Sequence, residues 1–267
     1  MNRRTTGHIT RAAAALALVF GLGALFAGKA RGQDRTFDWS GRVAAGQTLE
    51  LKGVNGSVNA RPASGPVASV TAHIEGDGDD PSEVRIEVVE HDGGVTLCAV
   101  YPDEDNECAP GDGGSLSSDD SDVDVRFEAL VPRGVHFSGR TVNGEVDASD
   151  LGGDVTARTV NGGIRLSTTG SATAHTVNGT IEAEMGALSG GGPYRFETVN
   201  GGITLTLPEG TGADVEARTL NGGITTDFPL TVQGRFGPRS LQGTIGGGGP
   251  GLRLETTNGS IELRRAG

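Results

Sequence analysis

The feature that most constrains this chain is a short sequence that returns at nearly even intervals. Thr-Val-Asn-Gly stands at 141–144, again at 159–162 and again at 176–179. Asn-Gly pairs begin at positions 143, 161, 178, 200, 221 and 258, and Gln-Gly at 242 fills the one long gap, so the spacings are 18, 17, 22, 21, 21 and 16 residues. A period of about 20 residues is typical of units that bury a core only when they stack on one another.

Apolar residues keep fixed places within each copy. The residue three places after the Asn is Val or Ile in all seven copies, and the residue before the Asn is Val or Leu in six of them. We therefore expect Val160, Ile164 and Leu166 to point inward. A divergent eighth copy, Val-Asn-Gly-Ser-Val, begins at Val54.

Two kinds of β structure can use this pattern. Asn-Gly is a common two-residue hairpin turn, and seven hairpins would make a meander, sandwich or barrel. Alternatively, each copy is one coil of a stack, and insertions then collect at one place in the coil, as at 184–196. That second pattern, with no helical period, favours an all-β, single-stranded parallel β-solenoid (β-helix) of about 16–22 residues per coil, with a less regular N-terminal β part.

Stacked coils would bring equivalent side chains about 4.8 Å apart. Amide side chains at that spacing bond to one another along the stack, and Gly supplies backbone freedom at the corner. The sequence therefore predicts a structural ladder of Asn143, Asn161, Asn178, Asn200, Asn221, Gln242 and Asn258.

The Thr-Val-Asn-Gly-x-Ile copies, the upstream Gly-Val-Asn-Gly-Ser-Val and the lead-in Ala-Leu-Val-Pro-Arg-Gly-Val-His-Phe at 129–137 carry a resemblance. They resemble the bacterial putative-adhesin family of unknown function built of β-strand repeats, which is related to the adhesin-like head GIN domains. The resemblance covers residues 36–265 and implies an exported β-solenoid without established enzymatic activity. It implies no catalytic residue and no cofactor.

The N-terminus has the layout of a secretory signal peptide over residues 1–32. Three arginines precede an acid-free apolar run at 12–28, and small residues follow at cleavage-compatible spacing. An uncleaved membrane anchor is the alternative, although spanning helices usually need about 20 apolar residues. We expect the chain to be exported, to the periplasm, the cell envelope or the medium, with no transmembrane helix after signal removal.

Charge divides the rest of the chain. Of the 34 Asp and Glu residues, 18 lie within 75–128, a stretch with only two arginines, Arg85 and Arg126. No basic patch suits nucleic acid. We expect irregular β coils or a cap with acidic loops over 33–130, and the regular Asn-Gly repeat solenoid over 131–265. The acidic segment should be a separate, mobile surface.

Two cysteines, Cys98 and Cys108, stand ten residues apart. In an exported chain they are expected to pair as a disulfide. A redox or metal pair is the alternative, but the chain has no Cys-x-x-Cys.

One recurring outward position, three residues before the Asn, is rich in charge. It predicts a possible binding stripe for envelope polysaccharide or another envelope protein, formed by Arg140, Arg158, His175, Arg218 and Arg239. Because Glu197 and Glu255 interrupt the stripe, an ordinary solvated face is the competing interpretation.

No catalytic or metal constellation emerges from the sequence. The acidic loops at 76–80 and 111–122 fit neither an EF-hand nor a calcium-roll repeat. Asp147, Asp150 and Asp154 form the closest acidic cluster in the repeats, where Asp is also a common turn residue. We therefore expect a non-catalytic adhesin-like protein for adhesion or scaffolding. The alternative is a polysaccharide lyase or hydrolase.

Overall fold

The computed structural model describes residues 34–118, 121–188, 191–237 and 239–267. The expected signal peptide lies outside them. Strands make up most of this part of the chain, which contains one short 3-10 turn, η1 (Pro81–Glu83), and no α-helix. The all-β class expected from the sequence is confirmed. Nothing in the described ranges is helical for long enough, or apolar enough, to cross a membrane.

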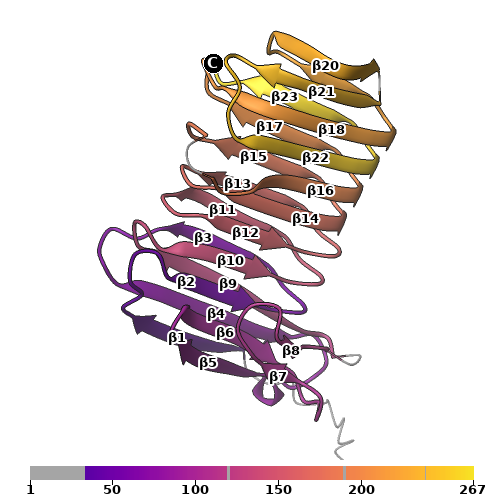
Figure 1. Ribbon diagram of the computed structural model, residues 1–267. Coiled ribbons are helices and arrows are strands. Elements are labelled where there is room, and N and C mark those ends of the chain that lie inside the picture. Colours follow the sequence, from indigo (N-terminus) through magenta and orange to yellow (C-terminus); the bar gives the residue numbers. More distant parts are fainter. Residues whose placement is uncertain (1–33, 119–120, 189–190, 238) are drawn as a thin grey trace, which may run out of the picture. The chain divides into compact units, whose positions relative to one another are not determined.

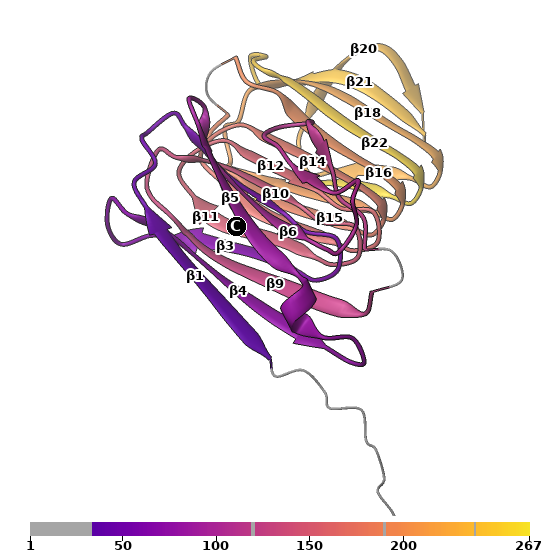
Figure 2. The same cartoon turned by 90° about the horizontal axis from the view of Figure 1, so that it is seen from below.

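Two large sheets lie face to face, and a small third sheet pairs β7 (Glu107–Cys108) with β8 (Gly114–Ser115). The first sheet runs, in spatial order, through β1 (Arg35–Gly41), β4 (Ala68–Gly76), β9 (Val123–Val131), β3 (Val58–Pro62), β11 (Val146–Leu151), β13 (Ile164–Thr168), β15 (Ile181–Met185), β17 (Ile203–Leu207), β23 (Ile261–Arg265) and β19 (Ile224–Thr226). The second sheet runs through β20 (Leu230–Gly237), β21 (Ser240–Ile245), β18 (Ala213–Asn221), β22 (Gly251–Asn258), β16 (Tyr194–Asn200), β14 (Ala172–Asn178), β12 (Val155–Arg158), β10 (His136–Arg140), β2 (Thr48–Lys52), β6 (Gly94–Val100) and β5 (Arg85–His91). Figure 2 shows the two sheets as separate layers.

Through the repeats, the chain places one strand in the second sheet and the next in the first, so that each repeat spans both layers (Figure 1). Neighbouring repeats pair in parallel and in register. Ile164 of β13 pairs with Ile181 of β15, which pairs with Ile203 of β17. Because the side-chain period of a strand is two, this register stacks every apolar residue on its counterpart in the next repeat.

The sheets are mixed, so the expectation of parallel pairing is confirmed for the repeats but not for the ends. Antiparallel pairs lie at both ends: β1–β4, β4–β9 and β5–β6 at one end, and β18–β21 and β20–β21 at the other. At the second end, the hairpin of β20 and β21 covers the edge of β18, and the first sheet ends on the three-residue strand β19. Covered or very short edges limit strand addition from other chains.

The order of the repeats in space differs from their order in the sequence. The last repeat, β22 and β23, inserts between β16–β17 and β18–β19. The sequence predicted that Gln242 stacks with the Asn residues, and this prediction is wrong. Gln242 lies on β21 and pairs with Glu216 across an antiparallel ladder. The Asn-Gly copy at 258–259 stacks in the row instead, between the copies at 200–201 and 221–222.

The core lies between the two large sheets and consists of aliphatic side chains with a few large aromatics. Ile164 and Leu166 of β13 are 2% and 1% exposed, as the sequence predicted. Phe196 and Tyr194 of β16 alternate inward on the opposing sheet.

At the corner that joins the two sheets, the buried residue is Thr, and the expectation for Val160 is wrong. Val160 is 38% exposed, whereas Thr159 beside it is 3% exposed. The hydroxyl of Thr159 donates to the carbonyl of Gly144 in the preceding repeat at 2.8 Å. A buried hydroxyl needs a hydrogen-bond partner, and the Gly carbonyl of the neighbouring repeat supplies one. The same bond recurs for Thr141, Thr176, Thr198, Thr256 and Thr219.

The corner Gly is required by close approach more than by backbone conformation. A Cβ on Gly162 would lie 2.0 Å from the carbonyl oxygen of Gly144, and one on Gly179 would lie 1.9 Å from that of Gly162. Neither residue has a positive φ. In this row only Gly56, with φ 113°, lies well inside the left-handed region, so the expected role of Gly as a source of backbone freedom is corrected to one of steric clearance.

Candidate binding surfaces

The Asn side chains at the corner form a continuous hydrogen-bonded row. Each Nδ2 donates to the Oδ1 of the preceding Asn in space at 2.7–2.9 Å, and Asn55 at the start of the row donates to the carbonyl of Ser121. The Asn row is, in order, Asn55, Asn143, Asn161, Asn178, Asn200, Asn258 and Asn221. An amide has two N–H donors and an oxygen with two lone pairs, so each keeps bonding capacity for solvent or a ligand.

A column of charged side chains runs beside the Asn row on the outer face of the second sheet. This charged column is, in spatial order, Lys52, Arg140, Arg158, His175, Glu197, Glu255 and Arg218. Of the stripe expected from the sequence, Arg140, Arg158 and His175 are adjacent. Arg218 lies beyond two acids, and Arg239 lies in the turn before β21, outside the column. Consecutive basic residues occur only at the end of the column that begins with Lys52.

The glutamates of the charged column are paired with arginines of the neighbouring outward position. Arg253 Nη2 lies 2.8 Å from Glu255 Oε2, and Arg253 Nε lies 3.8 Å from Glu197 Oε1. His175 Nδ1 lies 3.8 Å from Glu197 Oε2. These partly exposed pairs leave the C-terminal half of the column close to neutral.

The basic end of the charged column is covered by the loop that joins β6 to β9. Cys98 and Cys108 form a disulfide at the base of this loop. Further along the loop, Asp112 Oδ1 accepts from Arg140 Nη2 at 2.5 Å and from Arg158 Nη1 at 2.7 Å. The hydrogen bonds from Arg140 and then Arg158 hold the pKa of the Asp112 carboxyl below its usual value. The acidic segment was expected to be a separate surface, but its Asp112 docks on the stripe.

Beneath the same loop, two charged residues of β2 are buried. Glu50 is 5% exposed and Lys52 is 4% exposed. Lys52 Nζ donates to the carbonyls of Ala109 and Gly113, and Glu50 Oε2 accepts from the backbone N–H of Gly111 at 2.9 Å. Burial lowers the pKa of Lys52, although Glu50 opposes that shift. Sequence reasoning missed this pair, because nothing local to β2 indicates what covers its outer face.

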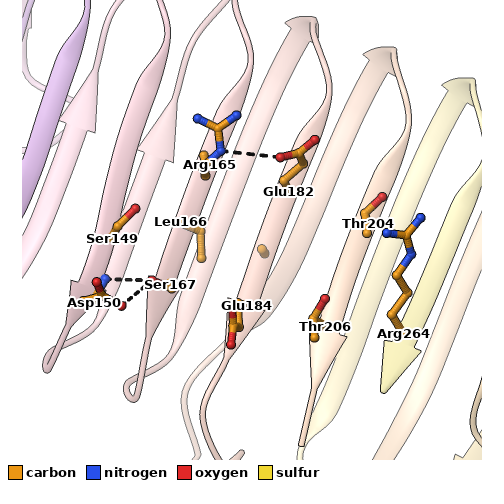
Figure 3. A pocket seen from close by; sticks show the side chains of 11 residues that line it. Ser149, Asp150, Arg165, Leu166, Ser167, Glu182, Glu184, Thr204, Thr206 and Arg264 are labelled. Carbon is orange, nitrogen blue, oxygen red and sulfur yellow. Dashed lines mark hydrogen bonds and ion pairs between the residues drawn. The ribbon is translucent and has the colours of Figure 1, made fainter. Parts of the chain in front are cut away.

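A second candidate surface is a shallow hollow of about 520 Å³ on the outer face of the first sheet (Figure 3). It crosses β11, β13, β15, β17 and β23, whose outward residues are hydroxyl-bearing or charged. Its polar side chains come from Ser149, Asp150, Arg165, Ser167, Glu182, Glu184, Thr204, Thr206 and Arg264. Arg165 Nε lies 3.4 Å from Glu182 Oε2, so both signs of charge are present in the hollow.

One edge of the hollow is a β-bulge at the end of β11. The register with β13 shifts between Ala148 and Leu151, and Asp150 has φ 60°, the single non-Gly positive φ among the described residues. The Asp150 N–H donates to Ser167 Oγ at 2.7 Å, which holds this backbone in place. Bulges and strained residues recur at functional sites, so the bulge supports the hollow as a candidate site.

The three acids that the sequence grouped lie in three different environments. Asp147 accepts both Arg61 guanidinium bonds at 2.9 and 2.8 Å, Asp150 lies at the bulge, and Asp154 lies 3.4 Å from His136 Nδ1 at the second sheet. Burial favours the neutral form of Asp147, but hydrogen bonds from Arg61 and Ser149 outweigh it, so its pKa lies below the usual value. Over the described ranges, no cluster of three His, Cys, Asp or Glu is suited to hold a metal.

Comparisons with known proteins give a likeness of fold. No protein-family model and no curated protein matches the sequence. A solved structure of a putative cell adhesion protein from Clostridium sporogenes is similar over 88% of this chain and 100% of that one, with a TM-score of 0.50 and 13% identity. A putative adhesin from Bacteroides fragilis matches over 86% and 97%, with a TM-score of 0.38 and 9% identity. The resemblance to adhesin-like proteins is thus confirmed for the fold.

Proposed function

We propose that this chain is an exported, non-catalytic, adhesin-like protein whose β-solenoid presents binding faces to envelope polysaccharide. The fold that it shares with a protein named a putative cell adhesion protein supports the adhesin-like part. The Cys98–Cys108 disulfide supports an oxidising compartment outside the cytoplasm. The expected signal peptide supports export to the periplasm, the envelope or the medium.

The observation that carries the binding proposal is the in-register stacking of outward polar residues. Strands of one sheet lie about 4.8 Å apart, so each outward position becomes a row of side chains with a regular spacing. The hollow adds a bulge, four hydroxyl groups and both signs of charge within one patch. Rows of this kind suit a partner that is itself extended and repetitive.

Separation of Asp147, Asp150 and Asp154, the acids that the sequence grouped, supports binding over bond cleavage. Glycoside hydrolysis uses two carboxylates about 5 to 9.5 Å apart on either side of the bond. Asp147 is committed to Arg61, and Asp154 lies beside His136 at the other sheet. The hollow also has no aromatic lining residue on which a sugar could stack.

The test is to incubate residues 33–267 with immobilised neutral and anionic polysaccharides, with and without calcium, and to score retention and chain cleavage together. We expect retention without cleavage. Arg264→Gln in the hollow should weaken it, while Arg85→Gln, which removes the same charge from an exposed strand outside the hollow, should not. Cleavage that Asp147→Asn or Asp150→Asn abolishes would instead support the enzyme. Failure to retain any polysaccharide would leave an envelope protein as the partner.

A further inference from the structure

We propose that the loop of residues 109–113 masks an anion-binding site, in which Arg140 and Arg158 would otherwise hold acidic groups of a linear anionic polysaccharide. Asp112 would then be an internal competitor for that ligand. The ligand class rests on the proposed function, whereas the masking rests on the contacts of the loop itself.

The Asp112 carboxylate occupies the place that an anionic group of a ligand would take. Arg140 on β10 and Arg158 on β12 are register partners on adjacent strands, and both donate to the same oxygen, Asp112 Oδ1. Guanidinium groups that converge on a carboxylate form charge-assisted hydrogen bonds, which are stronger than neutral ones. A carboxylate or sulfate of a polymer placed at this point would meet the same two donors.

The base and the tip of the loop differ in how firmly they are held, so a ligand could replace Asp112 at the tip. At its base, the loop is fixed by the disulfide and by the buried residues Glu50 and Lys52. At its tip, the Asp112 side chain is 78% exposed, and the side chains of Arg140 and Arg158 are 31% and 40% exposed. Gly111 has φ 64°, so a Gly precedes the acid at a left-handed position. The exposed Asp112 side chain can therefore turn away from the two arginines while the base stays attached.

The charged column explains why the expected ligand is linear. Past Arg158, the next position along the column is His175, which is exposed and lies one strand further on. A chain laid along the column would meet Arg140, Arg158 and His175 in succession, with one strand spacing between contacts. A compact anion would use only the two arginines that Asp112 occupies.

The size of the effect follows from the loss of the competitor. Two exposed ion pairs typically stabilise a contact by about 1 kcal/mol in total. Loss of the Asp112 contact should therefore raise the apparent affinity for the polysaccharide about fivefold. This factor is the quantity to be measured.

The experiment compares four proteins: wild type, Asp112→Asn, Glu104→Gln and the double variant Asp112→Asn/Arg158→Gln. Glu104 is an exposed acid of the same loop, so its substitution removes the same charge without touching the column. Binding to polygalacturonate and to dextran sulfate is measured at fixed ionic strength, to compare carboxylate with sulfate as the bound group. Hydrogen exchange of residues 109–113 is followed in parallel.

Asp112→Asn should bind at least one polymer about fivefold more tightly than Glu104→Gln, should exchange faster over 109–113, and should lose the gain in the double variant. Equal binding by Asp112→Asn and Glu104→Gln would overturn the masking, whether or not wild type binds. If Asp112→Asn binds a polymer and wild type binds none, the masking is supported. That result would contradict the proposed function, in which the wild-type protein itself binds polysaccharide. Wild-type binding with no gain in Asp112→Asn would leave the proposed function and remove only this inference.

Discussion

Substitution of the corner Gly162 by Ala tests the stacking most sharply. An Ala Cβ at this position would lie 2.0 Å from the carbonyl oxygen of Gly144, and side-chain Cβ atoms do not come closer than 3.0 Å to such an atom. The two repeats would therefore have to separate by about 1 Å. The neighbouring Gly163 is a matched control, because a Cβ there would meet its nearest atom, the Thr180 carbonyl oxygen, at 3.5 Å.

The cost can be worked from the bonds that this separation strains. Three of the hydrogen bonds that join the two repeats at the corner are Thr159 Oγ1 to the Gly144 carbonyl at 2.8 Å, the Gly144 N–H to the Asn161 carbonyl at 3.0 Å, and Asn161 Nδ2 to Asn143 Oδ1 at 2.9 Å. With about 1 kcal/mol for each bond, the free energy of unfolding should fall by about 3 kcal/mol. Overpacked positions show a similar loss of about 1–3 kcal/mol.

Urea unfolding followed by circular dichroism measures the difference between Gly162→Ala and Gly163→Ala. We expect a clearly lower midpoint for Gly162→Ala, and for Gly163→Ala a change between zero and about 1 kcal/mol of stabilisation from reduced freedom of the unfolded chain. Equal midpoints for the two variants would refute the close approach of neighbouring corners.

Three further predictions concern the buried Thr, the core and an ion pair. Thr176→Val should lose about 1 kcal/mol of stability in urea unfolding, because it removes the hydroxyl that bonds a neighbouring carbonyl at 2.9 Å, whereas Thr173→Val on the outer face should change little. Ile164→Asp should lose more than about 3 kcal/mol by burying an unpaired charge, against less than about 1 kcal/mol for Arg158→Ala, and equal losses of melting temperature would contradict the facing of these strands. Asp147 has a pKa depressed below 3.8, so its stabilisation is present above that value and is lost as the pH falls through the lower, folded value. The stability gap between wild type and Asp147→Asn should therefore close as the pH falls from 7 to about 2, and a constant gap would contradict this reasoning.

Most of the repeat architecture could be predicted from the sequence, because stacking imposes the same residue type at the same place. Ile164, Ile181 and Ile203 hold equivalent places in the repeats and pair in register. The Asn positions likewise identified the corner. The Thr that recurs before Val is an equally regular signal, and it marks the buried position, whereas the apolar pattern alone predicts that Val160 is buried.

The remaining features depend on contacts that no local pattern encodes. Insertion of the last repeat between its predecessors pairs strands that are distant in the sequence. The contact of Asp112 with Arg140 and Arg158 joins a loop to strands 28 and 46 residues away. One edge of the hollow is the bulge at Asp150, where the local Ser-Asp-Leu-Gly-Gly sequence indicates only a turn. The spacing of the repeats predicts which side chains form a row. Which rows another segment covers depends on contacts between distant parts of the chain.

The most direct test of the stacked arrangement, on which both proposed binding faces depend, is a pair of cysteine cross-links on the exposed row beside the Asn row. Val199 and Thr257 lie on adjacent parallel strands at the same register, and Leu220 lies on the far side of Thr257. Disulfides form when Cα atoms are about 4.4–6.8 Å apart, roughly one strand spacing. The Val199→Cys/Thr257→Cys variant should cross-link on mild oxidation, and Val199→Cys/Leu220→Cys should not. Efficient cross-linking of the second pair in place of the first would mean that the repeats stack in sequence order, which would contradict the account.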